Sequence, residues 1–80
     1  MQDIFERMQR IIADQFAVEP EEITEETSFE EDLGADSVDL VDLVMSMEQE
    51  FAINEVREEE LATLHTVGDC VEFLTKRLDK

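Results

Sequence analysis

Residues 36–51 read DSVDLVDLVMSMEQEF and show the helical period of this chain most clearly. When the segment is projected at about 100° per residue, most of its apolar side chains fall within one arc of about 100°, the width of a stripe that faces a core. These residues are Leu40, Leu43, Val44, Met47 and Phe51. The segment therefore predicts an amphipathic helix that begins at Asp36, which can cap it, and continues to about Phe51.

The same helix has a second, narrower apolar arc on roughly the opposite side, and acidic residues border it. Single hydrophobic side chains are common on protein surfaces, but a strip of them rimmed by acids is typical of a docking surface. We expect the partner-binding surface to consist of Val38, Asp39, Val41, Asp42, Met45 and Glu48. This surface would face away from the core formed by the first arc.

Helical spacing of apolar residues recurs near both ends of the chain. It predicts a first helix from Gln2 to Phe16 and a last helix that begins after Thr66. Thr66 and Asp69 have the spacing of a capping box, which supports that start. The inner stripe of the last helix is expected to contain Val67, Val71, Leu74 and Leu78.

The segments between these helices are polar and contain few apolar residues. The range Ala17–Ala35 reads as a long loop, and a short helix is expected at Glu58–Leu64. Isolated apolar side chains should hold the loop on the core, namely Val18, Ile23, Phe29 and Leu33. The predicted fold class is all-α: one domain over residues 1–80, a small four-helix bundle with three longer helices, one short helix and a long loop between the first two.

The charge of the chain is strongly acidic, with 23 Asp and Glu against 6 Lys and Arg and a net charge of −17. No base occurs from Ile11 to Val56. The bases are Arg7, Arg10, Arg57, Lys76, Arg77 and Lys80. Such a surface repels nucleic acid and anionic membranes, and it attracts basic protein partners.

Cys70 is the only cysteine and His65 the only histidine. Cys70 has no partner for a disulfide in the chain, and the two residues cannot assemble a metal site, so Cys70 is expected to fill space in the core. We expect His65 to be exposed before the last helix. Because the sequence shows neither a signal peptide nor an apolar run of about 20 residues, we expect a cytoplasmic protein that does not insert into membranes. We also expect it to be a monomer.

Ser37 directly follows the predicted cap, where the helix N-terminus favours an attached phosphate, although most serines near caps are structural. The surrounding run is Asp32-Leu33-Gly34-Ala35-Asp36-Ser37-Val38-Asp39. It resembles the phosphopantetheine attachment motif of acyl carrier proteins, whose core is Asp-Ser-Leu. Further matches are Thr27-Ser28-Phe29, Glu48-Gln49-Glu50-Phe51 and Thr66-Val67-Gly68-Asp69. The resemblance covers nearly the whole chain; it departs at Val38, where the family usually has Leu, and in the segment 54–65.

The resemblance implies a discrete acyl carrier protein that is not an enzyme. A phosphopantetheinyl transferase, the carrier-protein synthase, would move phosphopantetheine from coenzyme A to Ser37, beside the helix cap Asp36, and the thiol of the arm would hold acyl groups as thioesters. Expected partners are this transferase and basic-surfaced enzymes of acyl-chain synthesis and transfer. The expected pathway is fatty acid biosynthesis, with a dedicated carrier for polyketides or another specialised acyl pathway as the alternative. Family members are four-helix bundles that can shelter an acyl chain between helices.

Two other classes of function fit the sequence less well. A hydrolase with Ser37 as nucleophile needs a base within reach, but His65 is the only histidine and no GxSxG elbow occurs. A calcium-binding EF-hand loop from Asp32 fails because Ser37, rather than glycine, occupies its sixth position. No metal site is expected beyond weak divalent binding along Asp36, Asp39 and Asp42. A peptidyl carrier is disfavoured because Gly34-Ala35-Asp36-Ser37 differs from the usual Gly-Gly-His-Ser of that group.

Overall fold

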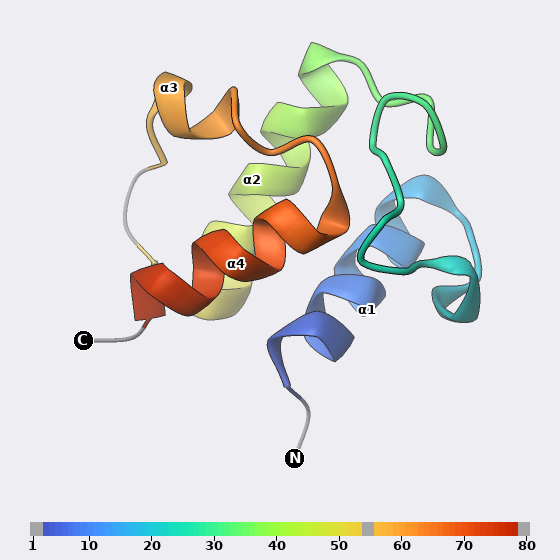
Figure 1. Cartoon of the computed structure of the whole chain (residues 1–80), viewed down its shortest axis with the longest axis horizontal. Helices are drawn as coiled ribbons and strands as arrows, with labels where there is room; N and C mark the ends of the chain where they lie inside the picture. Colours follow the sequence, from blue (N-terminus) through green and yellow to red (C-terminus); the bar gives the residue numbers. More distant parts are fainter. Residues whose placement is uncertain (1–2, 54–55, 79–80) are drawn as a thin grey trace.

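Helices make up the regular structure of residues 3–53 and 56–78, the part of the chain that the computed structural model describes (Figure 1). They are α1 (Ile4–Phe16), α2 (Ser37–Phe51), α3 (Glu58–Leu61) and α4 (Val67–Leu78), with a 3-10 turn, η1 (Pro20–Glu22), between α1 and α2. Among the described residues, extended pairing is limited to an isolated bridge between Ser28 and Thr66. The predicted all-α fold, with one short helix and a long loop after the first helix, is confirmed.

Two helix ends differ by more than one residue from the sequence-based prediction. Helix α1 begins at Ile4 because Asp3 is its N-cap: an oxygen of Asp3 accepts from the N–H of Glu6 at 2.9 Å, and the Glu6 carboxylate accepts from the N–H of Asp3 at 3.2 Å. Gln2, the predicted first residue, lies outside the described residues. Helix α3 ends at Leu61 rather than Leu64, because the N–H groups of Thr63 and Leu64 bond three residues back, in the tighter geometry of a turn.

Helix α1 packs against both α2 and α4, and the core lies between these three helices. The fully buried side chains are Met8, Ile12, Phe29, Leu43, Met47, Val67, Cys70 and Leu74. Cys70 occupies the core as predicted. The prediction for Leu78 is wrong: it is the last residue of α4 and is 40% exposed. The buried stripe of α4 runs through Val67, Cys70 and Leu74, with the spacing of three and four residues that one helix face requires.

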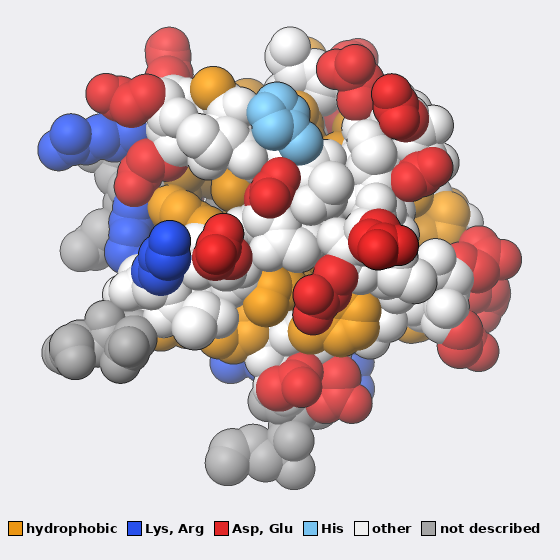
Figure 2. Space-filling model, in the orientation of Figure 1, with side chains coloured by type: hydrophobic (Ala, Val, Ile, Leu, Met, Phe, Trp, Pro, Cys, Tyr) orange, Lys and Arg blue, Asp and Glu red, His pale blue; other side chains and the backbone are white. Residues whose placement is uncertain are grey.

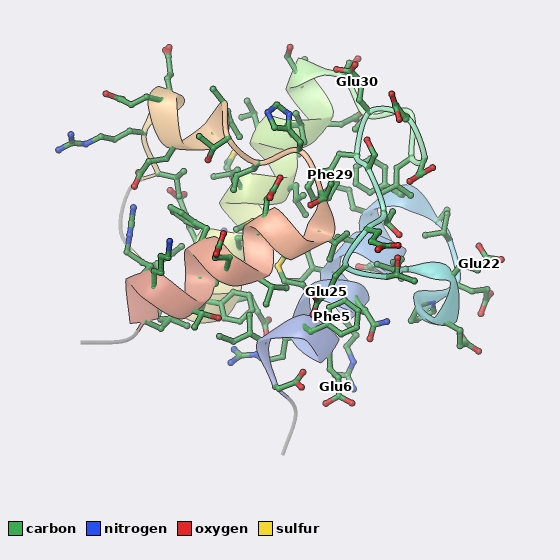
Figure 3. All side chains as sticks on the ribbon, in the orientation of Figure 1. Phe5, Glu6, Glu22, Glu25, Phe29 and Glu30 are labelled. Carbon is green, nitrogen blue, oxygen red and sulfur yellow. The ribbon has the colours of Figure 1, made fainter. Side chains whose placement is uncertain are left out.

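The long loop is held by the start of α4. The N–H groups of Val67 and Gly68 donate to the carbonyl oxygens of Thr27 and Glu25 at 3.0 and 2.8 Å. Gly68 permits this approach, because a Cβ atom there would lie 2.9 Å from the Glu25 oxygen. Figure 3 shows Phe29 directed from the loop towards the start of α4, whereas Glu22 and Glu30 extend outwards. Ile23 and Phe29 are buried, and the prediction that apolar side chains hold this loop on the core is confirmed.

Candidate functional site

The backbone before α2 is fixed by the same loop. Phe29 donates its N–H to the carbonyl of His65 at 3.0 Å, and its own carbonyl accepts from the N–H of Ala35 at 2.8 Å. Gly34 makes the turn between them with φ of 66°, a left-handed conformation that favours glycine. Because Ala35 is buried, the chain enters α2 from a fixed point.

Asp36 is the N-cap of α2, as predicted. Its Oδ1 accepts from the N–H of Asp39 at 3.0 Å, and Oδ2 of Asp39 accepts from the N–H of Asp36 at 3.1 Å. The amide nitrogen of Gln15 in α1 donates to the Asp39 carbonyl at 2.8 Å and braces this first turn. Ser37 is therefore the first residue of α2, and it is exposed.

Within residues 3–53 and 56–78, no basic group forms a hydrogen bond with the Ser37 hydroxyl. The carboxylates on either side, those of Asp36 and Asp39, each accept a backbone N–H of the capping box. His65 is exposed and belongs to the segment that leads into α4, in agreement with the prediction. An exposed hydroxyl at a helix start is open to an enzyme that brings its own base, and first-turn N–H groups favour a phosphate bound there.

Four of the six residues of the predicted partner-binding surface are exposed, and the other two form hydrogen bonds within the chain. Val38, Val41 and Met45 are 67%, 46% and 53% exposed, and Asp42 is exposed beside them. The two remaining acids have internal hydrogen bonds: Asp39 belongs to the capping box, and Glu48 accepts from the N–H of Val56 at 3.0 Å. The sequence-based prediction assigned Asp39 and Glu48 to this surface but gave no sign of their bonds, because the partner N–H groups belong to the cap of α2 and to the segment that follows the helix.

An apolar groove of about 240 Å³ lies between α2 and α3, and sequence analysis missed it. Its walls are Val41, Val44, Met45, Glu48, Val56, Glu58 and Leu61. Val41 lies one helical turn after Ser37, so the groove begins close to the candidate site. A larger groove of about 730 Å³ lies between α1 and α2, but its lining is mostly polar and belongs to the other flank of α2.

Acidic side chains cover the side of the molecule that carries the long loop, while Lys and Arg gather beside α3 and the end of α4 (Figure 2). Within the described ranges, no three Asp, Glu, His or Cys side chains are grouped to hold a metal ion. Weak divalent binding along Asp36, Asp39 and Asp42 therefore stays a prediction about charge. No helix in the part of the chain that is described is long and apolar enough to span a bilayer.

The geometry presents an exposed hydroxyl, that of Ser37, at the capped start of α2. Residues 6–74 match the family described as the phosphopantetheine attachment site, and the chain belongs to this family. It is a non-catalytic carrier, and its prosthetic group is covalently bound phosphopantetheine. The chain is also similar to the solved structure of an acyl carrier protein from Enterococcus faecalis, with a TM-score of 0.77 and 27% identity over 91% of each chain. Both findings support an acyl carrier role.

Proposed function

We propose that phosphopantetheine is attached to Ser37 and that the chain carries acyl intermediates of fatty acid biosynthesis as thioesters on this arm. The observation that carries the proposal is the exposed Ser37 hydroxyl at the first position of α2, in the order Asp36-Ser37-Val38. The terminal thiol of the arm supplies the acyl chemistry, and the protein supplies position and recognition.

Attachment requires one bond exchange at phosphorus. The Ser37 oxygen bonds to the phosphorus that carries pantetheine in coenzyme A, the diphosphate P–O bond breaks, and adenosine bisphosphate leaves. The hydroxyl proton passes to a base of the transferase. After transfer, the positive end of the α2 dipole favours the new phosphodiester, while the rigid capping box keeps its attachment point fixed.

Partner recognition is proposed for the exposed strip of Val38, Val41 and Met45, together with Asp42. The transferase and acyl-handling enzymes with basic surfaces would be attracted by the acidic carrier, and the apolar side chains would hold the docked complex. The carboxylates of Asp39 and Glu48 each accept a backbone N–H of this chain, so these two acids would contribute long-range attraction rather than direct contacts with a partner. We place this monomeric carrier in the cytoplasm, a reducing compartment that suits the unpaired Cys70.

Mass spectrometry tests the attachment site. Incubation with coenzyme A and a phosphopantetheinyl transferase should add one phosphopantetheine to the wild-type protein and none to Ser37→Ala. Ser46→Ala is the matched control, because Ser46 lies in the same helix, and it should be modified like wild type. Modification that persists in Ser37→Ala would contradict the proposal.

The mass of the protein isolated from its native host tests the pathway. Saturated and partly reduced straight-chain acyl groups on the arm support fatty acid biosynthesis. Poly-keto or other unusual acyl groups would instead support the specialised carrier. The two outcomes differ in elemental composition, so one intact-mass measurement followed by fragmentation of the arm separates them.

A further inference from the structure

An ion pair joins the short helix α3 to α4. A single guanidinium nitrogen of Arg77, Nη2, donates to both carboxylate oxygens of Glu60 at 2.9 Å. The guanidinium also lies over the ring of Phe73, 4.8 Å from its centroid. Arg77 and Phe73 are four residues apart on α4, so they share a face, and the stacking holds the cation in position for Glu60.

Besides this ion pair, helix α3 is held by Leu61, which is half-buried and packs against the core. The helix is four residues long and contains no fully buried residue. Glu60 has a second role, because its Oε1 accepts from the N–H of Arg57 at 3.0 Å and so caps the start of α3. The Glu60 carboxylate therefore both caps the start of α3 and forms the ion pair with α4.

The position of α3 determines the width of the apolar groove between α2 and α3. Leu61 of α3 forms one wall, and Val41 and Met45 of α2 form the other. The volume of about 240 Å³ is below the roughly 300–1,000 Å³ of pockets that enclose drug-sized ligands. A long acyl chain entering from the side of Ser37 would need α3 to move away from α2, and this movement strains the contact between Glu60 and Arg77.

We infer that Glu60 and Arg77 determine which acyl chain lengths this carrier shelters, because their ion pair opposes the widening of the groove between α2 and α3. The inference rests on the proposed function, since the acyl chain reaches the groove from an arm on Ser37. Short chains fit without disturbing the pair. Long chains are sheltered only at the cost of loosening it.

Hydrogen exchange of the unmodified protein tests the first half of this inference. Glu60→Gln keeps an acceptor for the cap of α3 but removes the charge. The N–H groups of Leu61 and Ala62, which donate to Arg57 and Glu58 at 2.9 and 3.0 Å, should exchange about twofold to fivefold faster in Glu60→Gln and in Arg77→Gln, as expected for a largely solvated pair. Unchanged exchange would overturn the inference.

The matched control is a second ion pair of the same kind. Arg7 of α1 donates to Glu50 at 3.1 Å and lies over the Phe51 ring at 4.4 Å, with exposure similar to that of the Glu60–Arg77 pair. This pair joins α1 to α2 and does not border the groove. Arg7→Gln should therefore leave exchange in α3 unchanged, even where it lowers overall stability.

Acylated proteins test the second half. A transferase loads each variant with butyryl, octanoyl or palmitoyl phosphopantetheine, and cleavage of the thioester by hydroxylamine is timed. Relative to wild type, Glu60→Gln and Arg77→Gln should slow cleavage of the palmitoyl form about twofold to fivefold without changing the butyryl form, and Arg7→Gln should change neither ratio. Equal dependence on chain length in all four proteins would overturn the inference alone, whereas failure to load Ser37 would contradict the proposed function.

Discussion

Asp36 and Asp39 hold each other in place at the start of α2. Each side chain accepts a hydrogen bond from the backbone N–H of the other, at 3.0 and 3.1 Å. This reciprocal contact fixes the first turn of the helix and makes Ser37 its first residue. Asp36 and Asp39 therefore hold the helix start in place in addition to carrying negative charge. A substitution of Asp39 that is meant to test its charge would also remove one of the capping hydrogen bonds.

Loss of the cap should lower stability and slow modification together. Asp36→Ala removes the acceptor for the Asp39 N–H, which should cost about 0.5–2 kcal/mol of unfolding free energy. The frayed helix start should also reduce the rate at which a transferase modifies Ser37. Chemical denaturation and timed mass spectrometry measure the two effects. Asp42→Ala, an exposed acid of the same helix outside the box, should leave stability within about 0.5 kcal/mol of wild type; equal losses in the two variants would refute this role of the cap.

The arrangement around Ser37 was accessible from sequence because it is local. A cap three residues before its partner and apolar residues at helical spacing define α2 without knowledge of other segments. The same projection separated the exposed Val38, Val41 and Met45 from the buried Leu43 and Met47. Local patterns therefore predicted both faces of this helix.

Features that depend on distant partners could not be predicted in this way. The bond of Glu48 to Val56, that of Gln15 to Asp39, and the ion pair of Glu60 with Arg77 all join separate segments. The early end of α3 reflects a change in backbone hydrogen bonding rather than a change in composition. The groove between α2 and α3 is likewise a property of packing, so no single stretch of sequence indicates it.

The loss of stability at acidic pH should depend on Asp69. Burial raises the pKa of Asp69, but hydrogen bonds from the N–H groups of His65 and Thr66, together with the Thr66 side chain, lower it to a net value below the ordinary 3.8. Because the folded state lowers this pKa, the carboxylate contributes stability that is complete above the unfolded value and is lost as pH falls through the folded one. The melting temperature of Asp69→Asn should be below wild type at neutral pH, and the difference should narrow below about pH 3.8. Glu21→Gln, at an exposed acid of η1, is the control for the loss of one negative charge.

Thiol titration should distinguish the buried cysteine from the arm. Burial, assisted by the neighbouring Asp69 charge, raises the pKa of Cys70 to about 12. The folded, unmodified protein should therefore not react with an aromatic disulfide reagent at neutral pH, and it should expose one thiol after unfolding. The folded, modified protein should react once, through the arm. Rapid reaction of the folded, unmodified protein would show that Cys70 is not buried as described.

Salt and magnesium should stabilise the fold at neutral pH. A net charge of −17 makes self-repulsion oppose the compact state, and screening or ion binding relieves it. A gain of about 1 kcal/mol would raise the melting temperature by about 4–8 °C in a domain of this size. If divalent ions bind along Asp36, Asp39 and Asp42, magnesium should raise the melting temperature more than sodium does at equal ionic strength. Asp42→Asn should reduce this difference between the two salts. A melting temperature that does not change with either salt would contradict the prediction.

The two faces of α2 should respond differently to the same substitution. Met47 is fully buried, so Met47→Ala should lower stability by about 2–5 kcal/mol. Met45 is 53% exposed on the proposed docking strip, so Met45→Ala should leave stability nearly unchanged and mainly increase the rate at which a partner enzyme dissociates. Asp42→Lys should instead slow association and weaken its dependence on salt, because charge acts chiefly on encounter and the capping box stays intact. Denaturation curves and stopped-flow binding to the transferase separate these effects, and equal destabilisation by the two methionine substitutions would mean that the docking surface lies elsewhere.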